Sequence, residues 1–236
     1  MSAGIELPRR VFAHGFLLNR DEKMSKSVGN VVDPVALIEQ FGVDQVRYFL
    51  LREIPFGQDG SYSDEAIITR INTDLANELG NLAQRSLSMV AKNLAGIVPE
   101  PTDLTADDEE LLALADGLLE RVRAHFDAQA MHLGLEAIWL MLGAANRYFS
   151  AQQPWVLTKS ESAADRARFG TVLYTTLEVV RIAALLIQPV MPESAGKLLD
   201  LLGQSDGQRM FAAIGERLKS GIALPAPAGV FPRHLP

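Results

Sequence analysis

Two lysines and two serines stand close together in the polar segment DEKMSKSVGN, residues 21–30. Lys23 and Lys26 are three residues apart, and Ser25 and Ser27 flank the second lysine. Ammonium groups on long, flexible stems can follow negative charge as it moves from one phosphate to a departing pyrophosphate, and the hydroxyls can add hydrogen bonds. The segment is thus a candidate polyphosphate site. A solvated basic turn is the alternative, because short basic motifs are common.

A second set of polar side chains falls on one face of a predicted long helix. Asn81 and Arg85 are four residues apart, so they lie on the same face. An amide offers both a donor and an acceptor, and a guanidinium offers a planar fork of donors, so the pair can read the edges of bases. A plain solvent-facing side is the alternative. The predicted polar stripe also contains Asp74, Asn77, Ser88 and Lys92.

A tryptophan follows a proline in the segment NRYFSAQQPW. Pro154 is expected to end a helix and to place Trp155 at the junction between that helix and a loop. Unpaired RNA bases stack on aromatic faces, and each stacked base contributes about 1–3 kcal/mol. Trp155 is therefore a candidate base-stacking residue, with burial in the core as the alternative.

The elements that would position these residues are mostly helical. Residues 11–18 predict a short strand that leads into the lysine–serine loop. Apolar residues at intervals of three and four, with caps such as Asp33 and Ser63, predict the helices that follow. The predicted helices span residues 34–41, 43–54, 63–96, 106–125, 128–152, 162–187 and 192–202.

This pattern predicts a mainly α fold, in which an α-helical bundle follows a small strand–loop–helix module. We divide the chain into that module, residues 1–62, the helical bundle, residues 63–205, and a proline-rich segment, residues 206–236. The last segment is expected to pack back on the bundle. Among single residues, Trp139 is expected in the core.

Bulk composition is that of a globular protein. The 236 residues are 48% hydrophobic and 22% charged, and there is no cysteine, which excludes disulfides and cysteine-ligated zinc. A net charge of −7 argues against a broad, positively charged surface for binding nucleic acid, so any nucleic-acid interface should be small. The most apolar stretch, residues 179–192, contains an arginine, a glutamine and two prolines, and we expect no membrane span.

The sequence KMSKS resembles, letter for letter, the signature loop of class I aminoacyl-tRNA synthetases, and the stretch around it is similar to bacterial methionyl-tRNA synthetases. The resemblance implies a class Ia anticodon-binding domain after the loop. It also implies that Lys23 and Lys26 are catalytic and contact the ATP phosphates, with Lys26 the stronger candidate. Met24, Ser25 and Ser27 complete the nucleotide-binding loop, in which the two serines would brace the backbone.

Two further motifs are similar to the anticodon-reading elements of the same family: NLAQR, which contains Asn81 and Arg85, and QQPW, which contains Pro154 and Trp155. On this resemblance these four residues would recognise the CAU anticodon of tRNA(Met), with Trp155 stacking on its first base. The combination disfavours the related synthetases for leucine, isoleucine, valine and cysteine.

The resemblance also implies what lies outside this sequence. The nucleotide-binding half of such a synthetase, with its methionine pocket, is not present. We therefore expect a C-terminal portion of the enzyme that cannot activate methionine alone, uses ATP with Mg²⁺ only in the complete ligase, and holds no zinc. A cytoplasmic monomer is expected. Two alternatives stay open: a non-catalytic tRNA-binding protein derived from a synthetase, and a helical scaffold that binds a protein partner.

Overall fold

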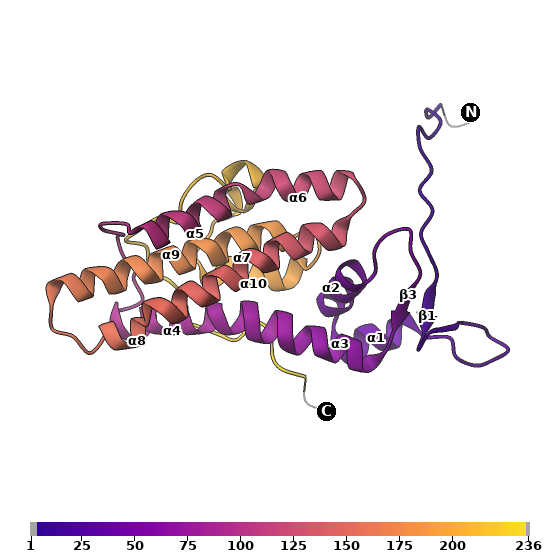
Figure 1. Ribbon diagram of the computed structural model, residues 1–236, viewed down its shortest axis with the longest axis horizontal. Helices are drawn as coiled ribbons and strands as arrows, with labels where there is room; N and C mark the ends of the chain where they lie inside the picture. The colour runs from indigo at the N-terminus through magenta and orange to yellow at the C-terminus, as the bar shows by residue number, and fades with distance from the viewer. Residues whose placement is uncertain (1–3, 235–236) are drawn as a thin grey trace.

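The computed structural model describes residues 4–234, and these are mainly helical, which confirms the predicted fold class (Figure 1). A small sheet and two helices lie at one end, and a long helical bundle forms the rest. The elements are β1 (Leu17–Asn19), β2 (Glu22–Lys23), α1 (Pro34–Phe41), α2 (Val43–Glu53), β3 (Gly60–Tyr62), α3 (Asp64–Arg70), a π-helical segment (Ile71–Gly80), α4 (Asn81–Asn93), α5 (Ala106–Asp116), α6 (Leu118–Asp127), α7 (Met131–Gln152), α8 (Pro154–Leu157), α9 (Ala163–Ile187), α10 (Pro192–Leu201) and two short 3₁₀ turns (Asp206–Arg209 and Phe211–Ala213).

The small sheet has the strand order β2-β1-β3. β1 pairs antiparallel with β2, with Leu18 opposite Lys23, and parallel with β3. The predicted strand over residues 11–18 is wrong for most of its length, since only Leu17 and Leu18 of it belong to β1. The reason is that residues 11–16 find no ladder partner among residues 4–234, and Val11 remains 86% exposed.

One continuous helical run, α3 through α4, joins the small module to the bundle. The Ser63 hydroxyl caps its start by accepting a hydrogen bond from the Ala66 amide at 3.1 Å. The ten central residues form a π-helix, in which backbone hydrogen bonds reach one residue further than in an α-helix. Side chains of α7 donate to carbonyls of this segment: Trp139 to Asp74 at 3.3 Å and Asn146 to Glu78 at 3.1 Å. The long helix was predicted, but its π geometry was not.

α9 is the central helix of the bundle. Between Phe169 and Ile187 every residue is buried, because α4, α5, α7 and α10 surround it. By length and composition α9 is apolar enough to cross a membrane, but its most apolar stretch is entirely buried inside the protein. It is thus a core helix. Trp139 is 6% exposed, as predicted for a core residue.

Two predicted helices are shorter than expected. The helix over residues 106–125 is broken at Gly117 into α5 and α6. The helix over residues 128–152 begins only at Met131, since Gln129 adopts a left-handed conformation with a φ of 60°. The turn at residues 128–130 lets α7 run back along α6 (Figure 1).

The small module is tied to the bundle through α2. The Arg47 guanidinium donates to the carbonyls of Val190 and Pro189 at 2.7 and 2.8 Å, and the Asp44 carboxylate accepts from the Ser194 amide at 2.6 Å. These bonds hold α2 against the corner between α9 and α10. The small module that carries the lysine–serine loop is therefore connected to the bundle by a polar joint, in which Asp44 and Ser194 are buried and Arg47 is exposed.

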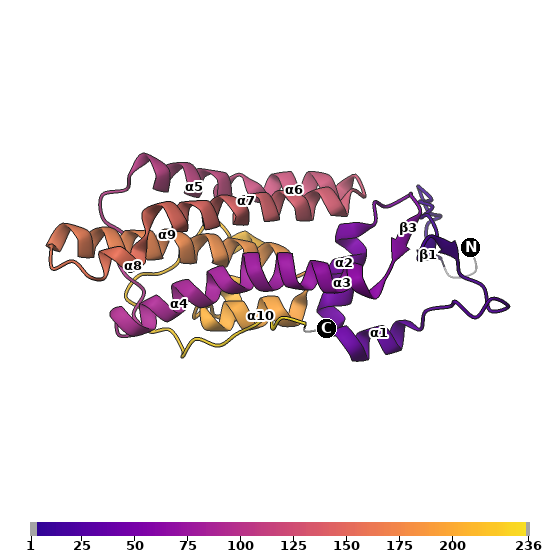
Figure 2. The same ribbon diagram turned by 60° about the horizontal axis from the view of Figure 1, so that its bottom comes forward.

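The C-terminal segment packs back along the bundle and returns toward α3 (Figure 2). A buried ion pair holds its first part: Glu178 accepts from the Leu218 amide at 2.8 Å, and Arg181 donates to the Ile214 carbonyl at 2.9 Å. Further on, Phe231 packs on the long helix at Gly80, where an added Cβ would lie 3.3 Å from the Phe231 side chain. Gly80 thus permits a close approach of the segment.

Candidate nucleic-acid interface and nucleotide loop

The lysine–serine loop leaves the sheet at the end of β2 and is closed by Asn30. The Asn30 side chain accepts from the Ser25 amide at 2.8 Å and donates to the Lys23 carbonyl at 3.2 Å. The hydroxyls of Ser25 and Ser27 lie 2.7 Å apart. Internal hydrogen bonds therefore give the loop a defined shape. Asn30 was not singled out in the sequence, where it reads as an ordinary turn residue.

The two lysines of the loop have different surroundings. The Lys23 ammonium lies 4.5 Å from the centre of the Phe16 ring. Lys26 is exposed, and within residues 4–234 no carboxylate forms an ion pair with either lysine. Met24 is half-buried. Both ammonium groups are consequently available to an anion, and Lys26 is the less constrained of the two.

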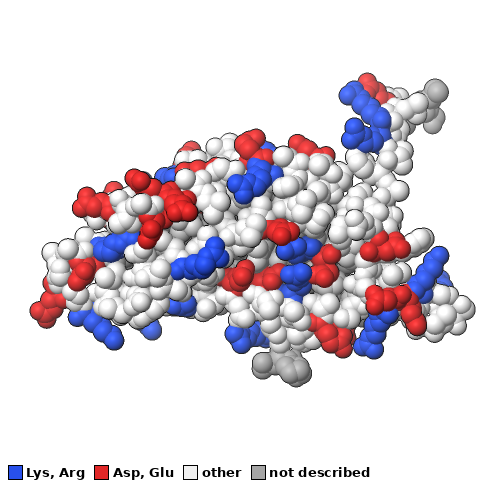
Figure 3. Space-filling model, in the orientation of Figure 1, with Lys and Arg blue, Asp and Glu red and all other residues white. Residues whose placement is uncertain are grey.

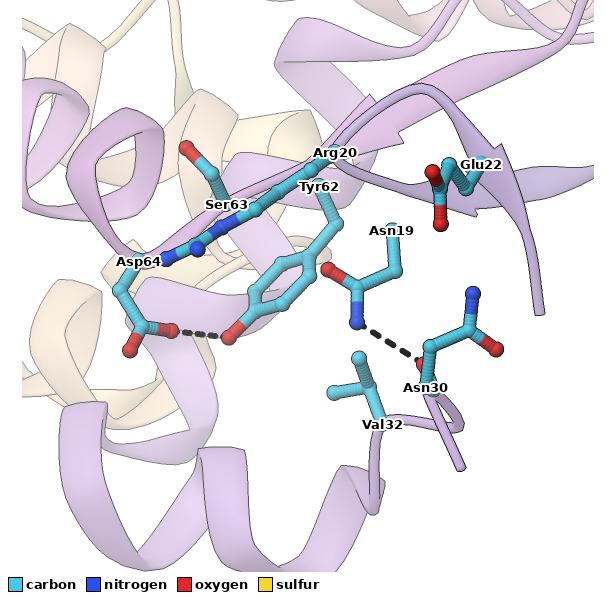
Figure 4. Close-up of a pocket in the computed structure, with 8 residues that line it drawn as sticks. All are labelled: Asn19, Arg20, Glu22, Asn30, Val32, Tyr62, Ser63 and Asp64. Atoms are coloured by element: carbon cyan, nitrogen blue, oxygen red, sulfur yellow. Dashed lines mark hydrogen bonds between the residues drawn. The ribbon is translucent and has the colours of Figure 1, made fainter. Parts of the chain in front are cut away.

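A hollow of about 500 Å³ lies beneath the base of this loop (Figure 4). Asn19 donates to the Asn30 carbonyl at 2.8 Å across one side of it, and Tyr62 hydrogen-bonds to Asp64 on the other. Burial, together with this bond to Asp64, raises the pKa of the Tyr62 hydroxyl, so it stays protonated at neutral pH. The pair of asparagines, which sequence analysis missed, anchors both ends of the loop to the sheet.

The predicted polar stripe on the long helix is only partly exposed. Asn81 is exposed and Arg85 is half-buried. Asp74 is not on a solvent-facing side: it is 9% exposed and accepts hydrogen bonds from Tyr48 at 2.7 Å and Arg70 at 3.1 Å. The π turn explains the difference, because it rotates residues before Gly80 relative to those after it.

Asn81 lines a groove between the long helix and the C-terminal segment. The groove has a volume of about 300 Å³, and its helix side also carries Asn77 and Gln84. On the other side, Arg233 hydrogen-bonds to the Asn77 side chain. The groove therefore presents several amides beside Asn81, and the residues of the C-terminal segment that complete it could not be placed there from the sequence.

Arg85 lies directly beside Trp155, although 70 residues separate them. The guanidinium carbon of Arg85 is 5.4 Å from the centre of the Trp155 ring and 4.9 Å from that of Phe149. Trp155 is 39% exposed, so part of its indole is open to solvent. The structure thus brings Arg85 and Trp155 together at one surface, with Asn81 one helical turn before Arg85.

A sharp corner presents Trp155. Gln153 adopts a left-handed conformation with a φ of 46° and ψ of 55°, which ends α7, and Pro154 is the first residue of α8. Pro154 is buried, and the Thr158 hydroxyl donates to the Trp155 carbonyl at 3.0 Å. The corner thus faces the indole outward while its proline side is packed inward.

The end of α7 is held by a buried carboxylate, Asp108. It accepts from Arg168 at 3.1 Å and from the Thr105 amide at 2.7 Å, and Tyr148 also hydrogen-bonds to it. Arg168 in turn donates to Gln152 at 3.2 Å. Burial alone would raise the pKa of the Asp108 carboxyl, but the hydrogen bonds from Arg168, Tyr148 and Thr105 outweigh it, so this pKa lies below its ordinary value.

We expect Asp108→Asn to lower the free energy of unfolding by about 3–5 kcal/mol at neutral pH, because Arg168 would lose its buried partner. A carboxyl whose pKa is lower in the folded state stabilises above its unfolded pKa of about 3.9. The difference between the two proteins should therefore shrink as the pH falls below that value. Urea unfolding across this range measures it. The control is Glu109→Gln, an exposed neighbour, and equal stability of both variants would contradict the prediction.

Charge on the surface is uneven. Acidic side chains gather over the start of α5, where Asp107, Glu109 and Glu110 are exposed (Figure 3). Nucleic acid is repelled by such a cluster. By contrast, none of the ion pairs among residues 4–234 involves Arg85, so its positive charge is not neutralised by a neighbouring carboxylate. Of these two surfaces, the one at α4 and α8 therefore carries a positive charge that no carboxylate pairs with.

Residues 1–87 match the family model described as tRNA synthetases class I (M), and residues 98–234 match the model described as the anticodon binding domain of methionyl tRNA ligase. With the helical bundle, these matches define a class I aminoacyl-tRNA synthetase. More particularly, the chain belongs to the methionyl-tRNA ligase family and contains the anticodon-binding domain of that family.

Individual relatives agree. Over all 236 residues the chain is 80% identical to the methionine–tRNA ligase of Mycobacterium tuberculosis and 57% identical to that of Brucella melitensis, and it covers 46% and 45% of them. A solved structure of the Mycobacterium tuberculosis methionyl-tRNA synthetase in complex with methionyl-adenylate is 81% identical, with a TM-score of 0.95, over 98% of this chain and 46% of that one. The chain thus spans about half the length of the relatives it matches.

Proposed function

We propose that this chain supplies the anticodon-reading surface and the phosphate-binding loop of a methionine–tRNA ligase. The observation that carries the proposal is the position of the Arg85 guanidinium, 5.4 Å from the partly exposed Trp155 ring and one helical turn from Asn81. A planar donor fork, an amide and an open indole face are the groups that single-stranded RNA recognition uses. Family membership makes tRNA(Met) the expected partner.

In this proposal the unpaired CAU triplet lies on the surface between α4 and α8. Trp155 stacks on the first anticodon base, and Pro154 fixes the turn that presents Trp155. Asn81 and Arg85 hydrogen-bond to base edges. Because the chain has a net charge of −7, base contacts must supply much of the affinity, and binding should depend less on salt than in a highly basic RNA-binding protein.

The loop acts in the first step, formation of methionyl-adenylate. A carboxylate oxygen of methionine attacks the α-phosphorus of ATP, and the bond to pyrophosphate breaks. Lys23 and Lys26 stabilise the negative charge that grows on the departing pyrophosphate. Met24, Ser25 and Ser27 hold the loop in shape, and the serine hydroxyls add hydrogen bonds to phosphate oxygens.

Two paired hydroxyls and two unneutralised ammonium groups fit a polyphosphate. Mg²⁺ would accompany ATP in the complete enzyme, but residues 4–234 hold no cluster of three acidic or histidine side chains suited to a metal ion. We therefore assign no step of the reaction to a metal held by this chain. The adenine, ribose and methionine sites would belong to the rest of the ligase, which we propose to be a cytoplasmic monomer.

Equilibrium binding of a labelled anticodon stem–loop tests the proposal. The chain should bind a CAU stem–loop at least about tenfold more tightly than one in which the first anticodon base is changed, since each good base contact is worth about 1–3 kcal/mol. Equal affinity for both would refute anticodon reading. Absence of all RNA binding would favour a helical scaffold for a protein partner. CAU preference in a full-length protein without ligase activity would favour a non-catalytic tRNA-binding protein.

A further inference from the structure

We propose that Phe149 is a positioning residue for anticodon recognition: its ring supports the Arg85 guanidinium beside Trp155 and leaves the N–H groups of Arg85 open to RNA. This inference rests on the proposed function. It adds a residue that the sequence does not single out, because Phe149 is one of many apolar positions on α7.

Three side chains from three helices meet at this point. Arg85 comes from α4, Phe149 from α7 and Trp155 from α8, and Figures 1 and 2 both place α8 beside α4. The guanidinium carbon lies 4.9 Å from the Phe149 ring centre and 5.4 Å from the Trp155 ring centre, and the two centres are 6.2 Å apart. These distances describe a nearly equilateral triangle, with the ring planes inclined at 52°.

Phe149 cannot touch RNA itself. It is 1% exposed and belongs to the hydrophobic core, whereas Trp155 is 39% exposed. The two aromatic residues therefore differ in role although both contact Arg85. Trp155 offers an open face to a base, and Phe149 can act only through the residues that lie on it.

Arg85 is held without using its donors. Within residues 4–234 it makes neither an ion pair nor a side-chain hydrogen bond. By contrast, Arg70, Arg168 and Arg181 donate hydrogen bonds to carboxylates. A guanidinium attracted to ring faces keeps its in-plane N–H groups free. A free arginine would lose much rotamer entropy on binding RNA, and a ring that fixes it beforehand removes part of that cost.

The test uses Phe149→Leu, which removes the ring but keeps an apolar side chain. We expect the affinity for the CAU stem–loop to fall about five- to tenfold, and the preference over the changed stem–loop to fall with it, because a cation–π contact between a half-buried guanidinium and a buried ring has about that strength. The matched control is Phe169→Leu, at a phenylalanine that is 4% exposed and lies on α9. It should bind the CAU stem–loop like the parent chain.

A double-mutant cycle separates positioning from general loss of structure. If Phe149 acts through Arg85, Phe149→Leu should have no further effect on binding in the Arg85→Ala background. Independent, additive losses would overturn the inference, as would equal binding by Phe149→Leu and Phe169→Leu. Should Phe149→Leu fail to fold, Phe149→Met fills the same space with a flexible apolar chain and gives the same cycle.

The failures of the two proposals are distinguishable. If the parent chain does not prefer the CAU stem–loop, the proposed function itself is wrong. If the parent prefers it and the cycle is additive, anticodon reading stands and only the role of Phe149 is rejected. Thermal melting of each variant, in the absence of RNA, shows that binding is compared between folded proteins.

Discussion

Replacing Lys26 with alanine, in a ligase of full family length that carries this sequence, should lower the rate of methionine-dependent ATP–pyrophosphate exchange about 10²–10³-fold. The reason is that removal of one preorganised charge leaves the negative charge of the departing pyrophosphate less stabilised in the transition state. Lys26 is exposed and makes no ion pair within residues 4–234, so its ammonium is free for that role. The effect should fall on kcat more than on the KM for methionine.

Lys23→Ala should have a smaller effect, because its ammonium already lies 4.5 Å from the Phe16 ring centre. The control is Lys197→Ala, since that lysine sits on α10 in an exposed ion pair with Glu193. An unchanged exchange rate in Lys26→Ala would contradict the assignment of the loop. The chain on its own, with both lysines present, should show no methionine-dependent ATP–pyrophosphate exchange. Clear exchange activity would refute that expectation.

Trp155→Ala is expected to weaken binding of the CAU stem–loop by about 1–3 kcal/mol, or roughly 5- to 150-fold. The loss should come mainly from stacking, so the affinity for a stem–loop that lacks the first anticodon base should fall less. The preference for CAU would then shrink. Since Trp155 is 39% exposed, its removal should leave the fold intact.

The other tryptophan provides a matched control. Trp139 is 6% exposed and donates to the Asp74 carbonyl within the core, so Trp139→Phe should change stability rather than RNA preference. A Trp155→Ala variant that binds both stem–loops like the parent chain would contradict the assignment of Trp155. A Trp139→Phe variant that lost CAU preference would show that the preference reports the fold rather than the surface.

The sequence predicts the helical elements well because their signals are local. Caps such as Ser63, the proline at the start of α1 and the apolar spacing of the long helix all act over a few residues. The loop motif is likewise contiguous. These features can therefore be predicted from residues that are adjacent in the sequence, without knowledge of the tertiary contacts.

The parts that could not be predicted depend on distant residues. The π-helical segment moves Asp74 into the interior, where Tyr48 and Arg70 donate hydrogen bonds to it. No local sequence pattern predicts this π geometry. Phe149 reads as another core residue until α4 and α8 are placed beside it. The strand prediction over residues 11–18 is wrong for the same reason. Strand formation needs a partner, and within the described residues 4–234 only β2 and β3 supply one, to Leu17–Asn19.

One double-mutant cycle tests anticodon recognition by Trp155 most directly. It combines Trp155→Ala with a CAU stem–loop in which the first anticodon nucleotide lacks its base, and binding is measured for all four combinations. If the indole stacks on that base, each change alone should weaken binding, and the second should cost almost nothing once the first is made. Losses that simply add would mean that Trp155 and the first anticodon base do not touch, which contradicts the account.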